Sequence, residues 1–129
     1  MSKVLIVDDH VAFSRGLRLM MKEIIEVDSI EEVRSGELFL KWLESSNTDL
    51  VFLDIRMPGI SGIEASRQAL KLYPDLKIIV LTMYGEHKYL EEAMETGVRG
   101  FILKPPGLSQ LKEAYTTVMD GGFYFPGIK

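Results

Sequence analysis

Residues 49–59, Asp-Leu-Val-Phe-Leu-Asp-Ile-Arg-Met-Pro-Gly, are the stretch that decides the fold. The apolar run 50–53 ends at the carboxylate of Asp54, and a Pro-Gly pair follows at 58–59. A short apolar run that is bounded by such a turn signal is typical of a buried strand. Asp54 is therefore expected where a strand ends and a loop begins. A carboxylate there is either a turn residue or a reactive group on a rigid support.

The composition is that of a globular domain. The chain has 129 residues, of which 47% are hydrophobic and 26% charged, which suits one domain with a single core. No apolar run approaches the length of a membrane span, so no membrane partner is expected. The absence of cysteine excludes disulfides and thiolate chemistry and is compatible with a cytoplasmic location. The net charge of −4 argues against direct contact with nucleic acid, because such domains are usually basic.

Apolar segments alternate with stretches of helical periodicity along the chain. Between and after the apolar segments, hydrophobic residues recur at steps of three and four, as expected for amphipathic helices. This alternation predicts an α/β fold with one parallel sheet and right-handed crossovers. The second segment is the weakest and would suit an edge of the sheet. The strands are expected at 3–7, 27–33, 50–53, 77–81 and 100–103.

Four of these five strands end in polar residues. Asp8 and Asp9 follow the first strand and Asp54 the third, while Thr82 and Lys104 follow the fourth and fifth. The carboxyl ends of parallel strands meet at one edge of a sheet, where sites form. Each residue alone has an ordinary explanation, such as a helix cap or a turn. Four such ends at one edge are hard to ascribe to coincidence.

The residue types at this edge suit phosphoryl transfer. Two carboxylates about 4 Å apart repel each other by roughly 4 kcal/mol at an effective dielectric constant near 20, so without compensation one or more of the three would take up a proton. A divalent cation removes this repulsion. Mg²⁺ binds such oxygen ligands while retaining several waters. Lys104 adds a positive charge for a phosphate oxygen, and Thr82 adds a hydroxyl. A carboxylate nucleophile, a metal and an ammonium together indicate phosphoryl transfer onto an aspartate.

On these residues the sequence resembles the receiver domain of bacterial two-component response regulators. The motifs are VLIVDDH at 4–10, DLVFLDIRMPGISGIE at 49–64, KIIVLTMY at 77–84 and GFILKP at 100–105. Their details are similar to the LuxR/NarL-type subfamily, in which a helix-turn-helix DNA-binding domain follows the receiver. The resemblance runs from residue 3 to about residue 119.

The resemblance implies a flavodoxin-like (βα)5 doubly wound sheet with the strand order 2-1-3-4-5. It implies a receiver over residues 1–121, with 122–129 as the start of a linker to a DNA-binding domain outside the chain. The domain would be a regulatory switch rather than an enzyme, phosphorylated by a sensor histidine kinase and able to form a homodimer. Its output would be transcription regulation. The alternative is a stand-alone receiver that acts through protein contacts.

The resemblance also implies roles for the acidic residues. Asp54 would accept the phosphoryl group. Asp9 and Asp54 would bind Mg²⁺ through their carboxylates, with the backbone carbonyl of Arg56 as a third protein ligand. Asp8 would act through the water shell of the metal.

Further roles fall on the last two strands. Thr82 and Lys104 would contact the phosphoryl oxygens. Thr82 and Phe101 would form the switch, with a phenylalanine where this family more often has tyrosine. The bond between Lys104 and Pro105 is expected to be cis.

Rival interpretations fit the residues less well. A phosphatase of the haloacid dehalogenase type needs a D-x-D motif after the first strand, where this chain has adjacent aspartates. A nucleotide- or flavin-binding module needs a glycine-rich loop there, and DDHVAFSRG at 8–16 is not one. A pseudo-receiver that serves only for dimerisation is disfavoured by the full acidic set. His10 and His87 are interpreted as surface or loop residues.

Overall fold

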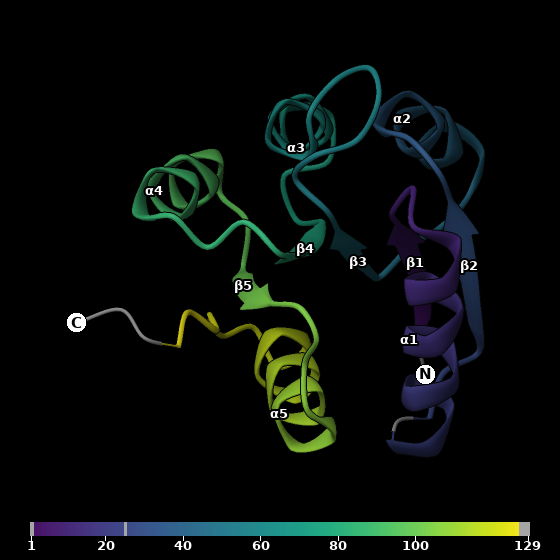
Figure 1. Ribbon diagram of the computed structural model, residues 1–129. Coiled ribbons are helices and arrows are strands. Elements are labelled where there is room, and N and C mark those ends of the chain that lie inside the picture. Colours follow the sequence, from purple (N-terminus) through teal and green to yellow (C-terminus); the bar gives the residue numbers. More distant parts are fainter. Residues whose placement is uncertain (1, 25, 127–129) are drawn as a thin grey trace.

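Five strands and five helices alternate along the chain (Figure 1). The structure is a computed structural model that describes residues 2–24 and 26–126. The strands are β1 (Lys3–Val7), β2 (Ser29–Val33), β3 (Leu50–Leu53), β4 (Lys77–Thr82) and β5 (Gly100–Leu103). The helices are α1 (Val11–Ile24), α2 (Gly36–Ser45), α3 (Gly62–Leu72), α4 (His87–Thr96) and α5 (Leu108–Met119).

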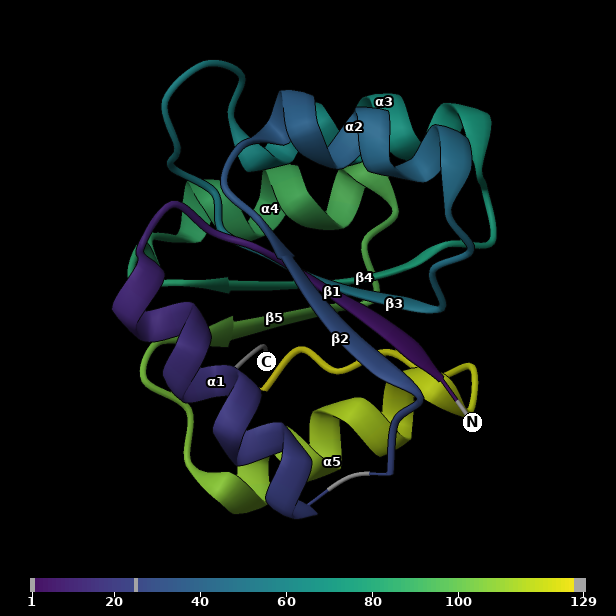
Figure 2. The ribbon, with the colours of Figure 1, turned by 90° about the vertical axis from the view of Figure 1, so that its right-hand side faces the viewer.

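The strands form one parallel sheet in the order β2-β1-β3-β4-β5, which confirms the expected fold. Figure 2 shows α1 and α5 on one face of the sheet and α2, α3 and α4 on the other. Strand β2 lies at the edge, as its sequence indicates, but it begins at Ser29, two residues later than expected. Its adjacent charged residues, Glu31 and Glu32, leave it only partly buried, which weakens the pattern by which its start could be found.

The sheet separates two hydrophobic cores. Successive residues of a strand point to opposite faces, so Leu5 and Val7 join one core while Val4 and Ile6 join the other. Strand β3 is buried along its whole length. It therefore forms the rigid support from which Asp54 projects, as the continuous apolar run predicts.

The segment after α5 lies against the outer edge of β5. The backbone N–H of Tyr124 donates to the carbonyl of Arg99 at 2.8 Å, and Phe101 N–H donates to the Tyr124 carbonyl at 3.0 Å. The first part of the expected linker, 122–126, is thus packed on the domain. Its remainder, 127–129, lies outside the described residues.

None of the helices in the described part of the chain combines the length and apolar character that a membrane crossing requires.

Leu17 and Leu19 on α1 provide a matched test of the core. Leu17 is 1% exposed and Leu19 is 66% exposed. We expect Leu17→Ala to lower the free energy of unfolding by about 2–5 kcal/mol, because it leaves a cavity. Leu19→Ala should change it by only about 0.5 kcal/mol. Urea denaturation measures both, and equal losses would contradict the assignment of the buried face of α1.

Candidate functional site

The carboxyl ends of four strands meet at one edge of the sheet, as the sequence predicts. Val7 and Leu53 are paired in the sheet, so Asp8 and Asp54, which follow them, lie side by side. The backbone N–H of Asp54 donates to the carbonyl of Val7 at 3.0 Å. On the other side of β3, Lys104 N–H donates to the Thr82 carbonyl at 2.8 Å. The sheet therefore brings these four residues to a single site.

The ammonium of Lys104 joins two buried carboxylates. Its Nζ lies 2.6 Å from Asp8 Oδ2 and 3.0 Å from Asp54 Oδ2. The three side chains are 5%, 3% and 1% exposed respectively, so each charge depends on the others for compensation. The peptide bond between Lys104 and Pro105 is cis. One ammonium facing two carboxylates leaves the site with an excess of negative charge.

The site fits a divalent cation. The Oδ1 atom of Asp9 is buried and has no hydrogen-bond partner among the described residues. Ligand atoms of Asp8, Asp9, His10 and Asp54 all lie within 4.8 Å of one another. A buried carboxylate oxygen without a donor, beside two further carboxylates, is the arrangement that a hard cation stabilises.

His10 belongs to this cluster, so its interpretation as a surface or loop residue was incomplete. Its side chain is 49% exposed, yet its Nδ1 lies 3.0 Å from Asp8 Oδ1 and 3.5 Å from Asp9 Oδ1. The available signal was its position directly after the two aspartates. By contrast, His87 is exposed on α4, where it pairs with Glu91.

Thr82 and Phe101 are both buried. Thr82 is fully enclosed, and its Oγ1 accepts a hydrogen bond from the backbone N–H of Tyr84 at 3.2 Å. The hydroxyl therefore holds the start of the β4–α4 loop. The ring of Phe101 is 7% exposed and packs in the core on the side of α2, α3 and α4. In this structure the aromatic residue already lies inward.

The Arg56 side chain links two loops above the site. Its guanidinium carbon lies 4.4 Å from the centre of the Tyr84 ring, and its Nη2 donates to the Tyr89 hydroxyl at 2.6 Å. The two tyrosine rings meet edge to face at 6.2 Å. The hydrogen bond to Tyr89 also raises the pKa of Arg56. The β3–α3 loop is thus tied to the β4–α4 loop, whereas metal binding by the Arg56 carbonyl stays a prediction.

A glycine supports the backbone of Asp54. Gly62 is the first residue of α3, and its N–H donates to the Ile55 carbonyl at 2.7 Å. A Cβ atom at Gly62 would overlap the carbonyl oxygen of Asp54. Only glycine therefore allows α3 to start this close to the acidic loop.

Two charged residues that the sequence analysis did not identify stabilise the backbone of the loops around the acidic site. One is Glu37 on α2, whose Oε2 accepts from the backbone N–H of Ile60 at 3.1 Å. Close to this contact, Gly59 adopts a left-handed conformation with φ of 86°. The β3–α3 loop is therefore held at both of its ends. No local sequence pattern marks Glu37, because the contact joins the start of α2 to a loop that is distant in the sequence.

The other missed residue is Arg34, which follows β2. Its Nη1 donates to the backbone carbonyl of Asp8 at 3.2 Å, and its Nη2 pairs with Glu32 at 2.6 Å. Burial raises the pKa of Glu32, but hydrogen bonds from Ser14 and Arg34 and the charges of Arg34 and Arg18 hold it below its ordinary value. The charged Glu32 thus fixes an arginine that orients the Asp8 backbone.

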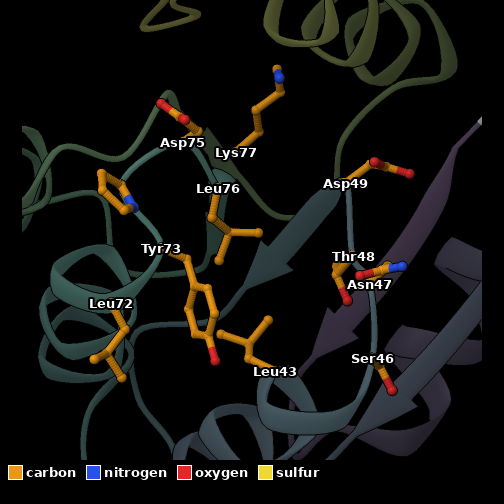
Figure 3. Close-up of a pocket in the computed structure, with 11 residues that line it drawn as sticks. Leu43, Ser46, Asn47, Thr48, Asp49, Leu72, Tyr73, Asp75, Leu76 and Lys77 are labelled. Carbon is orange, nitrogen blue, oxygen red and sulfur yellow. The ribbon is translucent and has the colours of Figure 1, made fainter.

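A separate pocket lies at the amino ends of the strands, opposite the acidic site (Figure 3). This cavity of about 480 Å³ is lined by the ends of α2 and α3 and by the loops that lead into β3 and β4. Asp49, Asp75 and Lys77 point away from one another there, and Asp49 accepts from the backbone N–H of Lys3 at 2.8 Å. The side chains that line this pocket do not converge on one point, and the pocket is not part of the acidic site.

Known proteins show the same organisation. Residues 4–116 match the response regulator receiver domain family. The chain is 32% identical to the transcriptional regulatory protein DegU of Brevibacillus brevis over 95% of its length and 52% of that relative. It is 35% identical to the response regulator GacA of Pseudomonas aeruginosa over 96% of its length and 58% of that relative. The RcsB response regulator of Salmonella typhimurium superposes with a TM-score of 0.90 at 25% identity, over 98% of this chain and 66% of that one.

The fold and the site define a class of regulatory domain with an acidic pocket at the carboxyl edge of a parallel sheet. Within that class, the chain belongs to the receiver domain family of two-component response regulators. The expected family is thereby confirmed. The chain spans little more than half the length of the two relatives above.

Replacement of Gly62 tests the support of Asp54. We expect Gly62→Ala to lower the free energy of unfolding by about 1–3 kcal/mol, because the new methyl group forces the Asp54 backbone to move. The control is Gly16→Ala within α1, where a Cβ meets nothing within 4 Å. That change should raise stability by about 0.5–1 kcal/mol. Urea denaturation of both variants checks the contrast, and a neutral Gly62→Ala would refute the close approach.

Proposed function

We propose that this chain is the phosphorylation-controlled switch of a two-component phosphorelay, in which Asp54 accepts a phosphoryl group from a sensor histidine kinase. The observation that carries the proposal is the burial of Asp54 at the sheet edge, with its Oδ2 3.0 Å from the Lys104 ammonium. Its Oδ1 accepts from the backbone N–H of Ile55 at 2.7 Å, which holds the carboxylate in one orientation. Membership of the receiver family supports the same role.

The proposed transfer needs little from the protein beyond positioning and charge compensation. A carboxylate oxygen of Asp54 forms a bond to phosphorus, while the bond between phosphorus and the kinase imidazole nitrogen breaks. Lys104 compensates the charge of the phosphoryl oxygens. The domain so assists its own phosphorylation and is a regulator rather than an enzyme that turns over a separate substrate.

We assign the cation of the site as Mg²⁺, held by the Asp9 and Asp54 carboxylates and the Arg56 carbonyl, with Asp8 acting through a water. The unpartnered Asp9 Oδ1 and the excess of carboxylates support this assignment. When bound, the cation supplies positive charge between the carboxylates and the incoming phosphoryl group. Lys104, whose Nζ lies 3.0 Å from Asp54 Oδ2, supplies further positive charge.

The proposed switch starts at Thr82. Phosphorylation adds about 1.5 to 2 negative charges and strong acceptor oxygens. The Thr82 hydroxyl then turns from the Tyr84 N–H toward a phosphoryl oxygen, and the β4–α4 loop moves with it. Since Phe101 is already buried, its ring acts as the packing surface over which this loop shifts. The result is a changed surface over α4, β5 and α5 for a partner to read.

The proposed output is transcription regulation through a DNA-binding domain outside this chain. The relatives are longer than the chain, and one RcsB structure, 26% identical with a TM-score of 0.89, is a complex with DNA. On this proposal the receiver covers residues 1–121, 122–129 begin the connection, and the protein acts in the cytoplasm, where two copies can associate. A stand-alone receiver that acts through protein contacts is the alternative.

Substitution of the acceptor tests the proposal directly. We expect Asp54→Asn to abolish phosphoryl uptake from a small phosphodonor such as acetyl phosphate in the presence of Mg²⁺, because the amide is not a nucleophile. Asp75→Asn, at an exposed aspartate away from the site, should label like the wild type. Intact-protein mass spectrometry reads the result. Labelling of Asp54→Asn would refute the central assignment, and chelation of Mg²⁺ should suppress labelling of the wild type.

The switch is tested at Thr82. With a beryllofluoride mimic of the phosphoryl group, we expect Thr82→Ala to lose the changes in backbone amide NMR shifts over residues 83–90. Thr82→Ser keeps the hydroxyl and should retain most of them. If Thr82→Ala responds like the wild type, the hydroxyl does not couple the site to the loop.

A further inference from the structure

The half-exposed imidazole of His10 contacts the acidic site from the solvent side. Its Nδ1 lies 3.0 Å from Asp8 Oδ1, 3.5 Å from Asp9 Oδ1 and 3.7 Å from Asp54 Oδ2. The backbone N–H of His10 donates to Asp8 Oδ1 at 2.8 Å, which fixes where the side chain begins. The ring nitrogen is therefore held near all three carboxylates.

These separations suit ligands of one metal ion. Protein nitrogen and oxygen ligands lie about 2.1 Å from a small divalent cation, so two neighbouring ligands are roughly 3.0 to 3.4 Å apart. The distances from Nδ1 to the carboxylate oxygens are close to that range. Asp9 Oδ1 has no hydrogen-bond partner among the described residues. Asp8 Oδ1 accepts from the backbone N–H of His10, but Lys104 contacts the other oxygen of Asp8, so Oδ1 does not share the ammonium.

We propose that His10 is a metal ligand of this site and sets its preference among divalent cations. Mg²⁺ favours oxygen ligands and retained waters, whereas imidazole suits Ni²⁺, Cu²⁺ and Zn²⁺. A nitrogen beside three carboxylates raises the affinity for these later ions above that of an all-oxygen site. The inference rests on the proposed function only in placing a cation among Asp8, Asp9 and Asp54.

A purely structural His10 predicts a different outcome. In that case the imidazole serves only as a hydrogen-bond partner of Asp8, and its loss changes the affinity for all cations in the same proportion. A ligand role changes the ratio between Ni²⁺ and Mg²⁺ affinities. The ratio therefore separates the two roles.

Calorimetric titration of the untagged chain with NiCl₂ and with MgCl₂ tests the proposal. His10→Asn should weaken Ni²⁺ binding by about tenfold or more, because even the loss of a residue that only orients a metal ligand costs about that much. Mg²⁺ binding should stay within about twofold of the wild type. The matched control is His87→Asn, because His87 forms the other histidine–carboxylate pair, with Glu91 at 2.7 Å on the exposed face of α4. His87→Asn should keep the wild-type ratio between the Ni²⁺ and Mg²⁺ affinities of the acidic site.

A spectroscopic measurement adds a readout of the ligand itself. Electron paramagnetic resonance of the Cu²⁺ complex should show nitrogen coupling in the wild type and in His87→Asn, and the coupling should be lost in His10→Asn. Circular dichroism and urea denaturation verify that His10→Asn is folded. An unchanged ratio of Ni²⁺ to Mg²⁺ affinities in His10→Asn overturns the ligand role and leaves the proposed function intact. If the wild type binds neither ion, the cation site itself fails and this inference fails with it.

Discussion

The ion pairs that Lys104 makes with Asp8 and Asp54 are the interaction on which the rest of the site depends. The three charges come from the ends of β5, β1 and β3, so the pairs join strands that are far apart in the sequence. Removing one partner from such a buried set leaves an uncompensated charge and typically costs about 3–5 kcal/mol. Because the pairs are nearly excluded from water, water cannot screen a change of charge at Asp54. Neighbouring groups must therefore move to compensate it.

A second set of contacts holds the backbone that carries these charges. Arg34 donates to the carbonyl of Asp8, and Glu37 accepts from the N–H of Ile60. Gly62 allows α3 to begin against the Asp54 carbonyl. The loops of the site are thus rigid on the side of β2, α2 and α3. On the other side, the β4–α4 loop is held by the Thr82 hydroxyl and by the partly exposed cluster of Arg56, Tyr84 and Tyr89. Because these contacts are closer to solvent, this loop is freer to move.

The sequence predicts the fold well where burial is continuous. Strands β1, β3 and β5 have the expected bounds, and β4 extends one residue further, because apolar runs buried on both faces leave a clear pattern. The start of β2 was placed two residues too early, since a half-buried edge strand carries a weaker signal. The convergence of Asp8, Asp54 and Lys104 also follows from the parallel topology.

The parts that escaped prediction depend on the direction that a side chain takes and on contacts between elements that are distant in the sequence. His10 is a half-exposed loop residue, as expected, but its contact with the carboxylates was missed because periodicity does not report how a side chain turns back toward its own strand end. Arg34 and Glu37 lie at the ends of other elements, and their partners are backbone groups that no motif reveals. The inward position of Phe101 likewise depends on packing rather than on residue type.

The pairing of Tyr124 with β5 has a consequence for the solubility of the domain. An open sheet has two edge strands whose free N–H and C=O groups can recruit another chain, which is a route to aggregation. Tyr124 uses the backbone groups of Arg99 and Phe101 on the β5 side. The β2 side carries Glu31 and Glu32, charges that disfavour such recruitment. Loss of the Tyr124 pairing would thus expose the edge of β5 near its start, and a chain shortened before this residue would be more prone to aggregate.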